Sequence, residues 1–541
     1  MKNLKPTLVF LFALCIFNFL KAQERLENKR QKPTTEDKFL DASEEPELSQ
    51  RLLPVSYTYN DGWLPSSPIG VATSIDAIIL ESGTVNITAN TVCDKLIVNA
   101  GATLTIASGV TLTAPIIDLH STTQLFSSLV SDGIIVGVVR YHRHTAQVAP
   151  IGTNDLISSP VSGQLFEAFD LTNTNLPDSG FIRAFAPYNT SVGAYQNYNV
   201  LTNALTVIES GVGYRTATTD GGTLTFTGVV RTDDVLDIPI SGAEAGGAWN
   251  LIGNPYPSYL DFDAFFTQNK SQLDLGGYQA IYGYDGDASD GWTVWNQATI
   301  DSPAITELIA PGQAFYVKSK SEGGLIDFTK AMRCAGSSDD FILGRTSTSP
   351  HHGHIQLNLS SGSSDFNTDF YFNSNATLDF DTGYDASLYS PTAPSFSIYS
   401  HLVENNSGIP LAVQALNPDA MYDVVVPLGI KANQGQEVTI SISETDMPTD
   451  IDIYLEDNLN NSFTLLNTGD YVFTAGNDLT GTGRFYLRFE GEALGTIKST
   501  KEDISIYTKS VDKIIVIDGQ LQQNTIATLY DVNGRVVLSN V

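Results

Sequence analysis

Three short segments near the start of the chain repeat one pattern, a glycine turn followed by a strand of alternating β-branched and aliphatic residues. The segments are 82–87 (SGTVNI), 100–106 (AGATLTI) and 108–113 (SGVTLT). Strands that recur with the same turn can stack as rungs, so that neighbouring rungs bury one another's apolar face. The pattern therefore predicts a short β-solenoid over residues 56–135. A plain antiparallel sheet with similar turns is the alternative reading.

The rest of the chain also favours strands over helices, so we expect an all-β protein. Charged residues make up only 16% of the 541 residues, while glycine and aromatic residues abound, which is typical of short strands joined by polar turns. We expect a central β-rich domain over 136–345 and a β-sandwich of immunoglobulin-like or jelly-roll type over 346–493. Eight strand candidates support the sandwich: 355–359, 370–372, 396–399, 423–427, 438–442, 451–455, 463–466 and 484–489.

The first 55 residues have the composition of an export signal and a linker. Lys2 and Lys5 precede an apolar run over 8–20, and Ala22 offers a small residue at a cleavage point. This order predicts a signal peptide over 1–22. Residues 23–55 are rich in charge and poor in aromatic residues, so we expect a flexible linker. No later stretch reaches the roughly 20 apolar residues that a transmembrane helix needs.

Charge and cysteine content restrict the partners and the means of stabilisation. The chain carries 60 acidic and 29 basic residues, a net charge of -31. Such a surface repels nucleic acid, anionic membranes and acidic polysaccharides unless a local basic patch intervenes. Beyond the signal peptide only Cys93 and Cys334 remain. We expect two unpaired buried thiols, with one long-range bridge as the alternative.

The C-terminal stretch predicts a small antiparallel β module. Its strand-like runs 504–507, 514–517 and 526–530 alternate with turn formers such as Asn533-Gly534. Through the run 529–537 (LYDVNGRVV) the module resembles the type A C-terminal sorting domain of proteins exported by the type IX secretion system of Bacteroidetes. That family continues with further strands after the Gly-Arg pair. We therefore expect residues 498–541 to be a partial, truncated sorting domain.

Three phrases in the central region strengthen this resemblance. They are 155–161 (DLISSPV), 249–259 (WNLIGNPYPSY) and 310–317 (APGQAFYV). They resemble phrases of flavobacterial cell-surface proteins that carry the same sorting tail, and the similarity runs from Trp63 onward. The resemblance implies a secreted protein at the outer face of the outer membrane, with the type IX secretion machinery as a partner. It implies little about chemistry.

A run of four residues is the candidate for catalysis. A polysaccharide lyase would need a group of Tyr, His and Arg side chains, and Tyr141, His142, Arg143 and His144 supply these residue types. On a strand neighbouring side chains point to opposite faces, so the four cannot converge without help from other segments. The alternative reading is a set of hydrogen-bonded structural side chains.

Two groups of aspartates are candidates for a calcium site, the one cofactor that we consider. Asp285, Asp287 and Asp290 lie on a glycine-bearing stretch, and Asp379, Asp381 and Asp385 form a similar group. Clustered carboxylates suit Ca²⁺, which takes oxygen ligands. The spacing departs from that of an EF-hand loop. Acidic turn residues that accept backbone N–H bonds are the alternative.

Aromatic residues are dense between positions 256 and 295, and two functions compete on this basis. The set is Tyr256, Tyr259, Tyr282, Tyr284, Trp292 and Trp295. Exposed aromatic rings can stack on sugar rings, although most large aromatic residues are buried in a core. We expect a non-catalytic adhesin-like or glycan-binding protein, with extracellular polysaccharide as its partner. The alternative is a secreted polysaccharide-degrading enzyme, with a lyase as the first choice.

Overall fold

The computed structural model describes residues 53–148, 153–284, 292–302, 308–336, 339, 352–389 and 393–491, together with four strands between 505 and 539. Residues Pro54–Val541 form one unit. The described elements are mainly strands, which confirms the all-β prediction. Among the described residues, no helix combines the length and apolar character needed to cross a bilayer.

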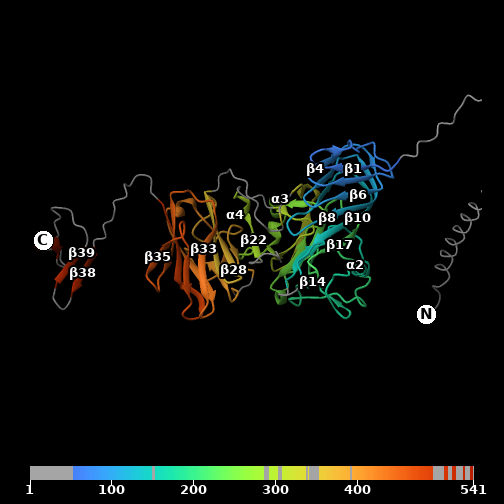
Figure 1. The fold of residues 1–541 in the computed structure, drawn as a ribbon. Coiled ribbons are helices and arrows are strands. Elements are labelled where there is room, and N and C mark those ends of the chain that lie inside the picture. Colours follow the sequence, from blue (N-terminus) through green and yellow to red (C-terminus); the bar gives the residue numbers. More distant parts are fainter. Residues whose placement is uncertain are drawn as a thin grey trace, which may run out of the picture. The chain divides into compact units, whose positions relative to one another are not determined.

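Two parallel sheets build the N-terminal part, and the solenoid-like region that we predicted is confirmed (Figure 1). The first sheet stacks its strands in parallel in the order β1 (Ser56–Tyr59), β3 (Ala77–Leu80), β6 (Lys95–Val98), β8 (Thr111–His120) and β10 (Ile134–His144). The second stacks β4 (Thr84–Ile87), β7 (Thr103–Ile106) and β9 (Ser128–Ser131). Short strands β2 (Trp63–Leu64) and β5 (Thr91–Val92) pair with β1 and β8.

The alternation of residues along each rung places one aliphatic side chain of every strand in a buried row. Ile78, Leu96, Ile117 and Val139 are partners in register across four strands, and each is fully buried. The intervening residues point outward, as expected from the two-residue period of a strand. Burial of such rows supplies the main favourable term of the solenoid's folding.

The last rung of the solenoid ends against an antiparallel strand. β17 (Thr223–Gly228) pairs with β10 from Val139 to His144. A bulge interrupts β10 between Val136 and Val138, and Gly137 lies there with a φ of 152°. The boundary that we expected after residue 135 therefore falls inside β10.

The central region consists of short sheets joined by turns, with small helices between them. One four-stranded sheet has the order β11 (Asp155–Ser158), β16 (Gly213–Thr216), β14 (Phe185–Asn189) and β15 (Ala194–Tyr195), and a second has β19 (Trp249–Gly253), β24 (Ala314–Lys318), β21 (Ile281–Tyr284) and β22 (Trp292–Trp295). Smaller sheets pair β12 (Asp178–Ser179) with β13 (Ile182–Arg183), β18 (Val235–Ile240) with β25 (Gly324–Phe328), and β20 (Tyr259–Asp261) with β23 (Leu308–Ile309) and β26 (Arg333–Cys334). The α-helices are α2 (Phe166–Thr172), α3 (Phe262–Asn269) and α4 (Gln297–Ile300), and the 3-10 turns of this region are η1 (Glu244–Gly246), η2 (Lys270–Gln272) and η3 (Lys330–Met332).

A proline turn fixes the path of the chain after β19. The Asn254 side-chain amide donates to the carbonyls of Ser258 at 2.7 Å and Ala310 at 3.0 Å, and its oxygen accepts from the Tyr256 N–H at 3.0 Å. Asn254 is fully buried, so these bonds satisfy a side chain that would otherwise be costly to bury. The turn therefore holds β19 and β20 in a defined orientation.

The second half of the chain forms one long hydrogen-bonded path of strands around a shared core. Its order is β35 (Ser462–Leu465), β34 (Ile451–Asp457), β37 (Leu479–Gly491), β32 (Asp423–Ala432), β30 (Ser397–Ser400), β31 (Leu411–Leu416), β28 (Ser364–Phe372), β27 (Gly353–Ser361), β33 (Glu437–Thr445) and β36 (Tyr471–Thr474), with β29 (Ala386–Ser387) beside β31 and η4 (Pro418–Met421) before β32. Leu357, Val426 and Leu487, from three of these strands, belong to one buried cluster. Each of the eight strand candidates overlaps one of these strands.

The three strand-like runs of the tail overlap strands, although the third run pairs with residues 536–539 rather than with the second run. β38 (Ser505–Lys509) pairs with β39 (Ile514–Asp518), and β40 (Thr528–Tyr530) pairs with β41 (Val536–Ser539).

Cys93 and Cys334 are both free thiols, the first buried and the second half-buried. Burial raises the pKa of each thiol to about 12. The reading of two unpaired thiols is therefore correct.

Candidate functional site

Strand β10 directs the four residues of the catalytic candidate to two different faces. Tyr141 points into the solenoid, where its hydroxyl donates to the Ser127 carbonyl at 3.0 Å, and burial raises its pKa above the usual range. Arg143 is also buried, at 1% exposure. Its guanidinium donates to the Gln313 side chain and to the His144 carbonyl, both at 2.7 Å. These two side chains stabilise the interior.

The two histidines of the run lie among other partners. His142 has its Nδ1 2.9 Å from the Thr225 hydroxyl and its Nε2 3.3 Å from the Asp118 carboxylate. The Nε2 of His144 lies 3.1 Å from the Gly221 carbonyl. Tyr141 and Arg143 are on the inner side of β10 and His142 is on the outer side, so the run cannot act together on one substrate. The structure thus corrects the lyase candidate and favours the structural reading.

Sequence reasoning missed the charged partners of His142. On the outer face of the first sheet, Arg140 donates to both oxygens of Asp118 at 2.7 and 2.9 Å. Lys95 lies 3.5 Å from the same carboxylate, and His120 stacks on His142 with ring centres 4.5 Å apart. We call these five residues the outer-face cluster. Arg140 follows Asp118 by 22 residues, which is the length of one solenoid rung. That spacing was the sequence signal from which the pair could have been predicted.

Ionisation in the outer-face cluster follows from its contacts. Burial alone would raise the pKa of Asp118, but the hydrogen bonds from Arg140 and His142 outweigh it and lower that pKa below its ordinary value. The pKa of His120 is lowered by burial and by the neighbouring His142. Asp118 therefore stays ionised at neutral pH and holds two cations beside it.

The calcium candidates differ in what the structure describes. Asp285, Asp287 and Asp290 lie outside the described residues. In the second group, Asp381 accepts from the Thr377 N–H at 2.6 Å, and Asp385 accepts from the N–H groups of Asp381 and Ala415 at 2.7 and 2.8 Å. Within the described ranges, no three His, Cys, Asp or Glu side chains are placed to hold a metal ion. The second group acts as acceptors for turns.

Four of the six aromatic residues considered for sugar stacking, Tyr256, Tyr259, Tyr282 and Trp295, are in the core, which corrects that prediction. Tyr256 and Tyr259 are fully buried and Trp295 is 2% exposed. The Tyr256 hydroxyl donates to the Phe328 carbonyl at 2.8 Å. Within the set, Tyr284 and Trp292 are half-buried. The dense aromatic residues thus belong to a core segment. The strand pattern could not show this from the sequence, because it does not reveal which face of each central sheet is covered.

Trp292 belongs to a larger aromatic cluster that the sequence did not reveal. Its centre is three buried rings, Trp249, Tyr282 and Tyr316, in which Trp249 contacts the other two. Six half-buried rings contact this centre or one another: Tyr188, Tyr195, Tyr278, Tyr284, Trp292 and Tyr389. Trp292 stacks on Tyr389 with ring centres 4.4 Å apart and planes at 15°. We call these nine residues the aromatic cluster. Its rings come from five separate segments of the chain, so no local pattern could have joined them.

Hydrogen bonds and cations fix the rings of the aromatic cluster. The Tyr316 hydroxyl donates to the Tyr195 hydroxyl at 2.5 Å, and the Tyr282 hydroxyl donates to the Ser387 carbonyl at 2.9 Å. Arg215 lies over the Tyr195 ring at 3.9 Å. Burial raises the pKa of Tyr195 and that of Tyr389, the latter above its usual range, so these phenols remain neutral. The cluster therefore presents rigid, uncharged rings.

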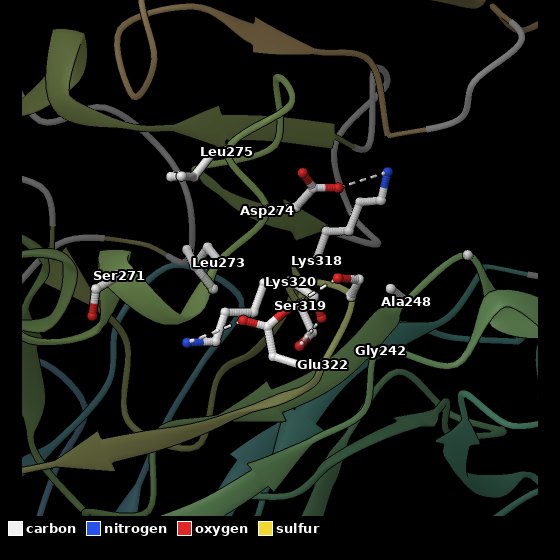
Figure 2. A pocket seen from close by; sticks show the side chains of 12 residues that line it. Gly242, Ala248, Ser271, Leu273, Asp274, Leu275, Lys318, Ser319, Lys320 and Glu322 are labelled. Atoms are coloured by element: carbon white, nitrogen blue, oxygen red, sulfur yellow. Dashed lines mark hydrogen bonds and ion pairs between the residues drawn. The ribbon is translucent and has the colours of Figure 1, made fainter.

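A pocket of about 560 Å³ adjoins the aromatic cluster. Figure 2 shows Lys318 facing Asp274 on one side and Lys320 reaching toward Glu322 on another. The charged nitrogen and oxygen atoms are 3.3 Å apart in the first pair and 4.0 Å in the second. Lys318 also lies over the Tyr278 ring at 3.5 Å, so one side chain belongs to both the pocket wall and the edge of the cluster. Gly242, Gly247, Ala248, Ser271, Leu273, Leu275, Ser319 and Ser321 complete the lining.

The chain belongs to a protein family with the description "Domain of unknown function (DUF8693)". The family model matches residues 57–489, which is most of the chain. No curated protein matches the chain. No solved structure matches it either.

Proposed function

We propose that this chain is a secreted or cell-surface protein that binds glycans without cleaving them, and that the type IX secretion system exports it. The aromatic cluster with its adjoining pocket is the observation that carries the binding part of the proposal. Half-buried aromatic rings offer an apolar face to the C–H face of a sugar ring. Polar groups in a neighbouring hollow then give orientation through hydrogen bonds to hydroxyl groups.

The rings of the cluster are suited to this role because they are held in place before a ligand arrives. Trp292 rests on Tyr389, and Tyr188 packs edge-on against Tyr195 with ring centres 5.4 Å apart. Side chains that do not need to be ordered on binding lose little conformational entropy. A surface of this kind gains affinity from preorganisation.

The charges of the pocket favour an uncharged sugar. Lys318 is paired with Asp274 and Lys320 with Glu322, so two positive and two negative groups cancel. The net charge of the chain is -31, which repels anionic ligands at long range. We therefore propose neutral, hydroxyl-rich glycans as ligands of this pocket.

A binding assay with single-residue variants tests the proposal. The full chain, Trp292→Ala and Phe181→Ala are compared on a glycan array and by titration calorimetry. Phe181 is a suitable control because it is an aromatic residue with 58% exposure outside the cluster. We expect Trp292→Ala to lose about 1–3 kcal/mol of binding free energy, the usual value of an aromatic hot spot, and Phe181→Ala to bind normally. Turnover of a bound polysaccharide into unsaturated products would contradict the non-catalytic part.

The export part rests on the signal-peptide pattern over 1–22 and on the resemblance of 498–541 to a sorting domain. Protease added to intact cells of a strain with this secretion system tests it. We expect the full chain to be digested, and a chain without residues 498–541 to be protected inside the outer membrane. Equal protection of both chains would refute surface export by this route.

A further inference from the structure

The outer-face cluster has the construction of a receptor for an anionic group. The Asp118 side chain is only 5% exposed, whereas those of Arg140 and Lys95 are 37% and 45% exposed. The buried carboxylate therefore lies beneath two cations and holds them on the surface of the sheet. Charged side chains that are oriented by a partner lose less entropy when they bind a ligand.

Both cations retain hydrogen-bonding capacity. An arginine has five N–H donors and a lysine has three. The contact with Asp118 uses two donors of Arg140, and Asp118 is also the only partner of Lys95, at 3.5 Å, within the described part of the chain. The remaining donors can form charge-assisted bonds to a carboxylate or sulfate oxygen, which are about twice as strong as neutral ones.

An apolar row lies directly beside the cations. Lys95 is in register with Ile116, and Ile116 is in register with Val138. The two aliphatic residues are 37% and 45% exposed. A sheet face that places two cations beside two exposed aliphatic side chains matches a chain of sugar rings that carry acidic substituents.

We propose that this face binds the carboxylate or sulfate groups of an acidic polysaccharide, at a site distinct from the aromatic cluster. Arg140 and Lys95 bind the anionic group, and Ile116 and Val138 contact the apolar face of the ring. Arg140 and Lys95 form the local basic patch that a chain with a net charge of -31 needs for such a ligand. The inference does not depend on glycan binding by the aromatic cluster.

The test is a titration of the full chain with three oligosaccharides of equal length, a polyuronate, a sulfated galactan and a neutral glucan, at low salt. Lys95→Gln is compared with Lys330→Gln, which removes the same charge at an exposed position of η3. We expect Lys95→Gln to weaken binding of the acidic chain about fivefold, and Lys330→Gln and Trp292→Ala to leave it unchanged. Preference for the polyuronate or for the sulfated chain identifies the anionic group.

No binding of either acidic chain, equal losses in Lys95→Gln and Lys330→Gln, or loss of acidic binding in Trp292→Ala would each overturn the proposal.

Discussion

Lys318 places its ammonium group 3.5 Å from the centre of the Tyr278 ring and 3.3 Å from the Asp274 carboxylate. The first contact belongs to the aromatic cluster and the second to the pocket wall. A ligand that fills the pocket would therefore meet the edge of the cluster. The contact makes Lys318 the most informative position for separating the structural role of the site from its binding role.

Replacement of Lys318 by methionine is expected to lower stability. Methionine keeps most of the apolar stem but removes the cation over Tyr278 and the partner of Asp274, so we expect a loss of roughly 0.5–1.5 kcal/mol in the free energy of unfolding. Lys320→Met is the control, since Glu322, its charged partner at 4.0 Å, is highly exposed. Urea denaturation of both variants measures the difference, and equal stabilities would contradict a structural role of the ring contact.

Replacement of the charged Asp457 side chain by a neutral one is expected to cause a large loss of stability. The carboxylate is fully buried, and it accepts from Arg484 at 2.9 and 2.7 Å and from the Tyr471 hydroxyl at 2.7 Å. Asp457→Asn leaves Arg484 without its anion, so we expect a loss of roughly 3–5 kcal/mol. In contrast, Asp233→Asn disrupts only the exposed pair with Arg231 and should cost less than about 1 kcal/mol. Chemical denaturation would contradict the prediction if the two losses were similar.

The buried carboxyl group of Asp385 is expected to make the stability of the fold depend on pH. Burial raises the pKa of this carboxyl to about 7, although the N–H groups of Asp381 and Ala415 favour its ionised form. Since the pKa in the unfolded chain is about 3.9, the folded state binds more protons between these values. Stability then falls as pH rises from about 4 to 7, by at most about 1.4 kcal/mol per pH unit. Asp385→Asn should remove this slope. Denaturation at several pH values measures it, and an equal change of the unfolding free energy with pH in variant and wild type would show that Asp385 does not cause it.

Gly137 occupies a position where any side chain should lower the stability of the fold. A Cβ atom there would lie 1.7 Å from the Ala114 carbonyl oxygen. Gly109 also has a positive φ, 78°, but a Cβ on it would meet nothing within 4 Å. We expect Gly109→Ala to cost about 1–2 kcal/mol from backbone strain alone, and Gly137→Ala to cost roughly 1–3 kcal/mol more from the clash. Thermal unfolding measures both variants, and equal costs would mean that the bulge in β10 can relax.

The solenoid could be predicted because its signals are local. Gly83, Gly101 and Gly109 each adopt a positive φ, at 73°, 82° and 78°, and each precedes a strand, as the repeat indicated. Alternation along the strand then decided which side chains are buried, as for Val85 and Ile87 in β4. The partner of β10 could not be inferred in this way, because β17 lies about 80 residues later and no short-range pattern links the two.

The candidate site was less predictable because its contacts join distant segments. The sequence offered His142 as a catalytic residue or as a hydrogen-bonded structural side chain. It could not name the partners, because Asp118 and Thr225 precede and follow His142 by 24 and 83 residues. Trp292 was predicted as a sugar-facing ring and remains a candidate. Its neighbour Tyr389 lies on a different segment, and only tertiary packing brings the two rings together.

The order of strands in the first sheet has a consequence for synthesis. A ribosome makes β10 before β17, so the backbone donors and acceptors on the outer edge of β10 stay open until residue 228 has emerged. Open edges readily pair with other chains, and nascent chains with such edges are prone to aggregation. The outer edge of β10 thus stays unpaired while the ribosome adds the residues between β10 and β17.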